Sequence, residues 1–230
     1  MLTLYHHSFC PNSRAVRLAL GEYGLFAKLV EIETWRRDAD FLALNPANTT
    51  PVLMLGGATP IVGVRPVLDY LDEVHGEGLG ENRLMPSHPE TRAEVRRLVD
   101  WFTDGFGADV TEYLVGEKLM KRYRPSEMGG GPPDTQKLKA GSQNLHTHLK
   151  YIAFLAMRRN WLAGDRLSHA DLVAAAHLST VDYLGDVPWD SVATAKDWYA
   201  RIKSRPCFRP VLSDRAKGLM PAPVYADLDF

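Results

Sequence analysis

The sequence has only two cysteines, Cys10 and Cys207, and no excess of charge of either sign. Two cysteines are too few for a disulfide framework, and no group of cysteines and histidines has metal-ligand spacing, so no metal site is predicted. The formal net charge of −1 provides no overall attraction to nucleic acid or to an anionic membrane. Any functional role of charge must therefore be local.

Long hydrophobic runs are also missing. No apolar stretch approaches the roughly 20 residues that span a membrane, and the N-terminus lacks a basic segment followed by an apolar one. We therefore expect a cytoplasmic protein without direct membrane insertion. The sequence shows no internal repeat, and its 230 residues can form one large domain or two small ones, each with its own core.

Alternating and helical hydrophobic patterns divide the chain into two domains. An alternation of strands and helices in the order βαβαββα predicts an α/β domain over residues 1–78. A Gly- and Pro-rich stretch at 79–89 reads as a linker, and apolar residues at three- and four-residue spacing predict an all-helical domain over 90–220. Residues 221–230 form an extended acidic and aromatic tail. The predicted fold class is α/β plus all-α.

The first strand ends in a turn that is followed at once by a helix. Backbone N–H groups and the positive end of the helix dipole meet there, so a hydroxyl or thiol could serve as an anion site or an activated nucleophile. The candidates are Ser8, Cys10 and Ser13. The alternative for Cys10 is a partly buried thiol that packs as a small hydrophobic group. The residues support both interpretations.

A second local motif lies in the helical domain. Ser168 is followed three residues later by Asp171, and an almost entirely apolar helical pattern begins between them. This spacing predicts a capping box, in which the acidic side chain reaches back to the N–H of the capping residue. A helix that is apolar all round is expected at the centre of a helical domain.

Several separated motifs together resemble the cytosolic glutathione transferases over residues 1–215. They are the turn Ser8-Phe9-Cys10-Pro11-Asn12-Ser13, the segments Leu44-Asn45-Pro46 and Thr50-Pro51-Val52-Leu53, Leu84-Met85-Pro86, the capping motif with the preceding Gly164-Asp165, and Trp198 with Arg205-Pro206. The resemblance implies a thioredoxin-like domain followed by an all-helical domain. It also implies that Pro51 is cis and that the backbone beside it faces the cysteinyl part of glutathione.

The sequence departs from this family where glutathione is held. Members that bind glutathione have Glu-Ser or Asp-Ser before the third helix of the first domain, and this chain has Gly63 and Val64 at the matching positions. Loss of two charge-assisted contacts could cost roughly 3–6 kcal/mol of binding, or about two to four decades in affinity. We therefore expect no glutathione cofactor and no catalytic turnover.

Two basic segments with aromatic neighbours are expected to border the groove between the domains. Trp35, Arg36 and Arg37 follow the second strand, and a second cluster ends the long helix of the second domain, with Tyr123 among its cations: Lys118, Lys121, Arg122 and Arg124. Such a composition fits a binding surface for an acidic partner. The alternative is a solvated basic helix end that complements its own dipole.

The tail carries hydrophobic side chains between acidic ones, namely Tyr225, Asp227, Leu228, Asp229 and Phe230, after two prolines that favour extended backbone. It could be a linear motif for another protein. Tyr225 and Phe230 could equally pack back onto the parent domain.

Together, the altered glutathione site, the basic groove and the tail resemble the FtsZ-binding, glutathione-transferase-like cell-division factors of bacteria. The resemblance implies a homodimer at the division site that binds FtsZ polymers, curves or bundles them and couples the ring to cell-wall synthesis. A second division protein would bind the tail. The competing interpretation is a glutathione-dependent transferase or thiol reductase that uses Ser8, Cys10 or Ser13.

Overall fold

The first domain is a four-stranded mixed sheet, seen in a computed structural model that describes residues 1–57 and 59–228. Its strand order is β2-β1-β3-β4, with β1 and β2 parallel and the other neighbours antiparallel. The strands are β1 (Leu2–His6), β2 (Ala27–Glu31), β3 (Val52–Leu55) and β4 (Ile61–Val62). The helices of this domain are α1 (Pro11–Glu22), α2 (Ala39–Leu44) and α3 (Val64–His75), with a 3-10 turn η1 (Thr34–Arg36). This is the predicted βαβαββα order, and the peptide bond between Thr50 and Pro51 is cis.

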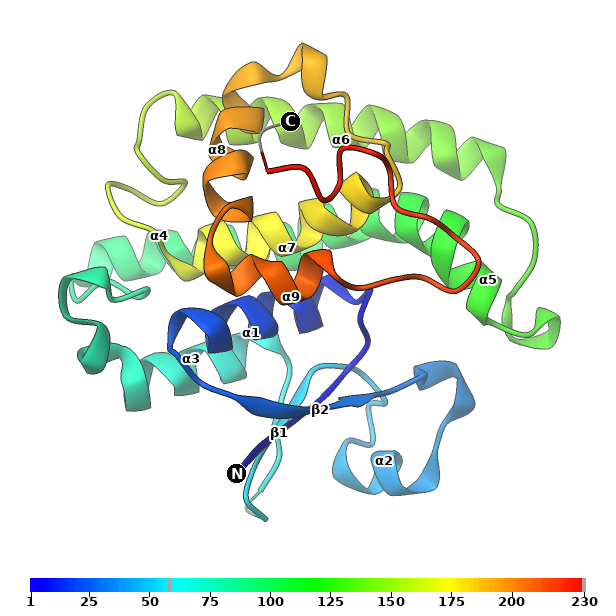
Figure 1. Cartoon of the computed structure of the whole chain (residues 1–230), viewed down its shortest axis with the longest axis horizontal. Helices are drawn as coiled ribbons and strands as arrows, with labels where there is room; N and C mark the ends of the chain where they lie inside the picture. The colour runs from blue at the N-terminus through cyan, green and yellow to red at the C-terminus, as the bar shows by residue number, and fades with distance from the viewer. Residues whose placement is uncertain (58, 229–230) are drawn as a thin grey trace.

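The second domain is helical. After the 3-10 segment η2 (Gly76–Asn82), α4 (Pro89–Asp100) continues directly into the more widely wound π-helix η3 (Trp101–Met120). The remaining elements are α5 (Lys121–Tyr123), η4 (Ser126–Met128), α6 (Thr135–Ala156), α7 (His169–Tyr183), η5 (Trp189–Ser191), α8 (Ala193–Lys203), η6 (Pro206–Phe208) and α9 (Arg209–Leu212). Figure 1 shows α1 and α3 between the sheet and these helices.

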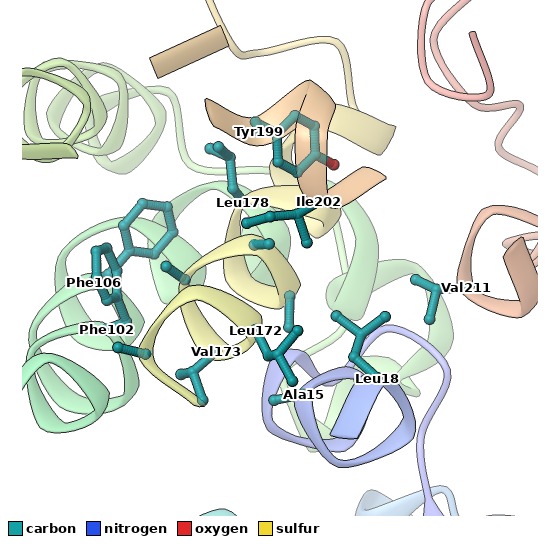
Figure 2. Close-up of a cluster of buried hydrophobic side chains, with 14 of the residues drawn as sticks. Ala15, Leu18, Phe102, Phe106, Leu172, Val173, Leu178, Tyr199, Ile202 and Val211 are labelled. Atoms are coloured by element: carbon teal, nitrogen blue, oxygen red, sulfur yellow. The ribbon is translucent and has the colours of Figure 1, made fainter. Parts of the chain in front are cut away.

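Helix α7 forms the centre of the molecule because every residue in it is buried. It packs against α1 of the first domain and against η3 of the second. Figure 2 shows the result: Leu18 of α1, Leu172 of α7 and Phe106 of η3 belong to one continuous apolar cluster. The two domains therefore share a core, and the groove between them has rigid walls.

The capping box is present at the start of α7. The Asp171 carboxylate accepts hydrogen bonds from the backbone N–H of Ser168 at 3.0 Å and from Leu162 and Trp198 at 2.8 and 3.0 Å. Burial raises the pKa of the Asp171 carboxyl above its usual value, although the hydrogen bonds from these donors oppose the shift. The motif thus fixes the central helix and the segments on both sides of it.

Candidate functional site

A groove with two compartments lies between the domains. The inner compartment, of about 270 Å³, runs from the turn after β1 to η3, and Phe9, Cys10, Thr50 and Val115 help to line it. The outer compartment, of about 310 Å³, includes Trp35, Arg37 and Met128. Both compartments are lined by the same three residues, Thr34, Asn48 and Arg124, so they adjoin and form one groove.

The opening turn places only one of its three nucleophile candidates in the groove. Ser8 donates its hydroxyl to a carboxylate oxygen of Glu31 at 2.8 Å, and its backbone N–H donates to the other oxygen at 2.7 Å. Ser13 is fully buried and accepts the backbone N–H of His7 at 3.3 Å. Cys10, the N-cap of α1, is partly exposed and lines the inner compartment. A thiolate bound near Ser8 would be repelled by the negative charge of the Glu31 carboxylate.

Two histidines beside this turn are uncharged at neutral pH. Burial lowers the pKa of His6 to about 4, although the nearby Glu31 carboxylate opposes the shift. Burial also lowers the pKa of His7, again against the effect of Glu31. The imidazoles therefore add no positive charge near Cys10, and activation of its thiol would depend on the helix dipole and its peptide groups.

Neither Gly63 nor Val64, at the start of α3, offers a polar side chain to a glutathione carboxylate, and Arg65 after them is paired with Asp100 and Asp104. Gly63 is its N-cap, with a φ of 93° and no side-chain cap, and Val64 is buried at 4 % exposure. A φ in this range favours glycine over other residues. Of the two positions that hold the γ-glutamyl group in the family, Gly63 thus has a positive φ and no side chain, and Val64 has a side chain buried in the core.

Aromatic rings close the outer side of the groove. The Trp35 ring stacks on Tyr123, with centroids 5.9 Å apart and an interplanar angle of 25°, and His7 contacts the edges of both rings. The first predicted basic segment and the helix end after η3 thus meet, as the sequence indicated. Trp35 serves partly to hold the two domains together at this point, because its ring is engaged within the chain.

The predicted cations differ in their availability. Arg36 forms an ion pair with Glu33, Lys118 with Asp186, and Lys121 with Glu117. The exposed Arg122 donates to the Lys118 carbonyl at 2.9 Å. These four side chains do not line either compartment.

Two cations remain in the groove. Arg37 and Arg124 line it, and neither forms an ion pair with any residue that the structure describes. The basic patch is therefore smaller than the seven-residue set predicted from the sequence, because carboxylates of the same chain neutralise part of it.

Of the two roles that the sequence allowed for Tyr225, a tail motif or a residue that packs back onto the domain, the structure has the second. Its side chain is fully buried, and its hydroxyl accepts from Arg14 at 3.2 Å and donates to the Val211 carbonyl at 3.1 Å. Asp227 and Leu228 are exposed. Asp229 and Phe230 lie outside the described residues. The sequence had left open whether Tyr225 packs back, and the structure decides that it does.

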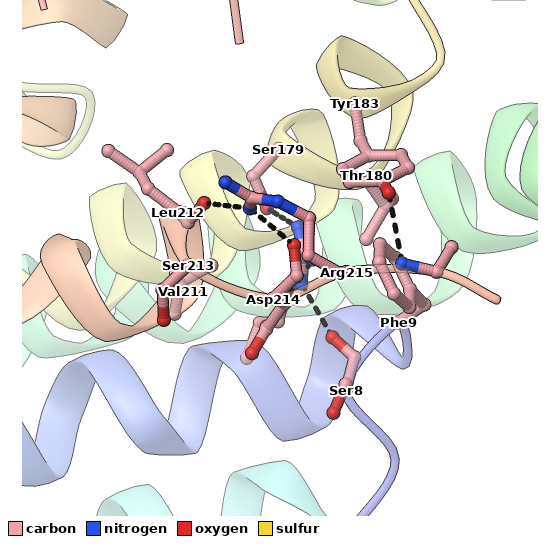
Figure 3. A network of polar contacts seen from close by, with 12 residues as sticks. Ser8, Phe9, Ser179, Thr180, Tyr183, Val211, Leu212, Ser213, Asp214 and Arg215 are labelled. Atoms are coloured by element: carbon pink, nitrogen blue, oxygen red, sulfur yellow. Dashed lines mark hydrogen bonds and ion pairs between the residues drawn. The ribbon is translucent and has the colours of Figure 1, made fainter. Parts of the chain in front are cut away.

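Arg14 is a residue that the sequence analysis missed. It is completely buried, and its guanidinium donates to the Ser8 carbonyl at 2.7 Å, to Ser179 at 2.9 Å and to Asp214 at 3.4 Å, in addition to Tyr225. Figure 3 shows Ser8, Ser179 and Asp214 converging on this network. A single cation thus connects the opening turn, the central helix α7 and the tail. Its position between apolar residues of the first helix was the sequence feature that could have identified Arg14 as a buried charge.

Asn48 is a second missed residue. Its backbone has a positive φ of 55°, its Nδ2 donates to the Thr34 carbonyl at 2.6 Å, and it lines both compartments. Its Oδ1 is buried and accepts no hydrogen bond from any described residue. A buried acceptor without a donor is unusual in proteins and points to something that binds there.

The described part of the chain has neither a membrane-spanning helix nor a cluster of metal ligands. None of the helices is long and apolar enough to cross a membrane. No group of three or more His, Cys, Asp or Glu side chains is placed to hold a metal ion, within the same residues.

The fold and the site define the class of the protein. Sequence models of the glutathione S-transferase N-terminal and C-terminal domains match residues 4–79 and 122–206. The chain belongs to the glutathione S-transferase family.

Individual members of the family are similar to this chain over its full length. The chain is 44 % identical to FtsZ-localized protein A from Caulobacter vibrioides, over 99 % of this chain and 98 % of that one. The crystal structure of FzlA from C. crescentus superposes with a TM-score of 0.91 at 44 % identity, covering 100 % of this chain and 99 % of that one. A glutathione S-transferase from Sinorhizobium meliloti superposes with a TM-score of 0.97 at 47 % identity, covering both chains completely.

Proposed function

We propose that this protein is a non-catalytic cell-division factor that binds FtsZ filaments through the groove. The observation that carries the proposal is the 44 % identity to FtsZ-localized protein A over nearly the full length of both chains. Since a relative named as a glutathione S-transferase is equally similar, the choice between the two functions depends on the chemistry of the site.

That chemistry favours binding over catalysis. Ser8 is bonded to a carboxylate, Ser13 is buried, and neither Gly63 nor Val64 can hold a γ-glutamyl group. The free cations Arg37 and Arg124 instead suit an acidic protein surface, which they would attract electrostatically. No cofactor is required for such a role.

The proposal extends to a cytoplasmic homodimer at the division site. A twofold dimer would present two grooves, so that it could bridge filaments or impose one geometry on them, and thereby bundle or curve them. The tail would bind a second division protein and couple the ring to cell-wall synthesis. Because Tyr225 is buried, the exposed part of the tail that such a partner could contact begins after it.

Reversing the charge of Arg124 tests the binding surface. Arg124→Glu should abolish co-sedimentation with FtsZ polymers, because it removes an unpaired groove cation and places a negative charge there. Arg122→Glu is the matched control: it makes the same change in net charge on an exposed residue outside the groove, and should pellet like the wild type. Equal pelleting of both variants and the wild type would exclude this surface.

A glutathione transferase or thiol reductase is the alternative, favoured by the partly exposed Cys10 in the inner compartment. Strong retention on immobilised glutathione, together with loss of that retention in Cys10→Ala, would support it over the proposal.

A further inference from the structure

The groove has an uneven distribution of polar groups that indicates the kind of ligand it fits. The outer compartment is lined by Arg37 and Arg124 and by no acidic residue. The inner compartment is lined on its η3 side by Glu112 and contains apolar surface from Phe9, Val115 and Met120. Because Arg37 lines the outer compartment and Arg124 lines both, an anionic group is favoured in the outer compartment next to the boundary, and the apolar surface of the inner compartment accommodates an apolar group.

Between the compartments lies an acceptor that needs a donor. Asn48 lines both, and its Oδ1 is buried and unpaired while its Nδ2 is engaged by the Thr34 carbonyl at 2.6 Å. That bond fixes the amide orientation, because a carbonyl oxygen can accept only from the NH₂ group. The Oδ1 therefore has an unfilled acceptor position for an N–H or O–H, at the boundary between the two compartments.

We propose that the groove binds an extended acidic peptide segment of the partner. A carboxylate binds Arg37 and Arg124, a main-chain N–H donates to the Asn48 Oδ1, and a neighbouring apolar side chain enters the inner compartment beside Val115. Extended chain suits this arrangement because successive side chains point to opposite sides while the peptide groups remain accessible. This inference rests on the proposed function and specifies the form in which the partner is recognised.

Cys10 provides a built-in reporter for occupancy of the inner compartment. It is partly exposed there, whereas Cys207 is buried where η6 packs against α1 and serves as an internal reference in the same molecule. Maleimide labelling of the full chain, followed by mass spectrometry, would give the reaction rate of each thiol. FtsZ polymers, and then blocked overlapping peptides that cover the FtsZ sequence, are the probes.

We expect FtsZ polymers and at least one acidic peptide to slow labelling of Cys10 and not of Cys207. Replacing the acidic residue of that peptide by its amide should weaken the affinity with which the peptide protects Cys10 about tenfold or more. Arg124→Glu should weaken it by a similar factor, and Arg122→Glu should leave it unchanged. If the polymers pellet but Cys10 reacts at an unchanged rate, or if no peptide protects it, the groove does not hold an extended segment. Failure of the wild type to pellet would instead refute the proposed function.

The contact with Asn48 has its own test. Glycine accepts the positive φ of this position, so Asn48→Gly removes the acceptor with little change in the backbone. Methylating the peptide amides one at a time should identify a single N–H whose loss weakens binding about two- to tenfold in the wild type and has no effect in Asn48→Gly. Equal losses in both proteins would contradict the assigned contact.

Free glutathione provides a last control for the ligand class. If it protects Cys10 as strongly as the peptide does, the proposal is overturned, because the groove would then keep the family's ligand.

Discussion

Single residues at the domain boundary are held in place by polar contacts that depend on protonation. His177 is buried, its Nε2 lies 3.2 Å from the Asn12 Oδ1 and its Nδ1 lies 3.3 Å from the Thr111 hydroxyl. Since an amide oxygen only accepts, the neutral ring donates to Asn12 and accepts from Thr111. This chain of bonds joins α1 to η3, the two walls of the inner compartment.

Stability should therefore fall on mild acidification. Burial, with a smaller contribution from the charge of His148, lowers the pKa of His177 to about 3, below that of an unfolded histidine. The unfolded state binds the proton first, so up to about 2 kcal/mol is lost between pH 7 and pH 5. In urea titrations, His177→Gln should flatten this pH dependence, and the exposed His146→Gln should not. An unaltered pH slope in His177→Gln would refute the assignment.

Some of these residue-level features could be predicted from sequence and others could not. Glu117 and Lys121 are four residues apart in a helix, so their ion pair was a recognisable local signal. Apart from Ser8, the partners of Arg14 are 165 to 211 residues away in the chain, and only the folded structure brings Ser179 and Tyr225 to one guanidinium. The unpaired acceptor of Asn48 likewise depends on the exact position of a neighbouring carbonyl.

At the scale of elements, alternating hydrophobicity was a sufficient guide to the strands, and the capping-box spacing before an almost continuous apolar run was a sufficient guide to α7. Close packing between helices was not visible in this way. Helix α6 crosses η3 at Gly141, where an added Cβ would lie 2.8 Å from the Cβ of Tyr113 and 3.0 Å from the side chain of Leu114. The glycine is therefore a packing requirement of the helical domain.

Gly141→Ala should destabilise the protein although alanine is the better helix former. The gain of up to about 1 kcal/mol in helix propensity is outweighed by overpacking, which typically costs about 1–3 kcal/mol. Gly107→Ala provides the comparison, since the nearest atom to its added Cβ is 3.8 Å away. A lower midpoint of urea unfolding is expected for the first variant and not for the second. Stabilisation by Gly141→Ala would show that α6 can move away from η3.

For the whole molecule, the tail belongs partly to the core and partly to the surface. The Val224 carbonyl accepts from the Lys203 amine at 2.9 Å, and the Tyr225 ring packs against Tyr183 with centroids 5.0 Å apart. Because Tyr225 also bonds to Arg14, which holds the Ser8 carbonyl, the tail stabilises the turn beside the groove. Asp227 lies next to this network, because its charge acts on Lys203 and its backbone N–H donates to the Val224 carbonyl at 3.2 Å.

Truncation of the tail and substitution of Tyr225 should therefore differ in their effects on stability and on FtsZ binding. Deleting residues 228–230, which begins at the exposed Leu228 and keeps Asp227, should leave the urea midpoint and co-sedimentation with FtsZ nearly unchanged while impairing division, because only the proposed second contact is lost. Tyr225→Ala should cost about 3–5 kcal/mol through the cavity and the unsatisfied Arg14, and weaken FtsZ binding as the opening turn loosens. Tyr225→Phe, which keeps the ring, should cost only about 1–2 kcal/mol. Loss of FtsZ binding on deletion of residues 228–230 would instead place the end of the tail at the filament contact.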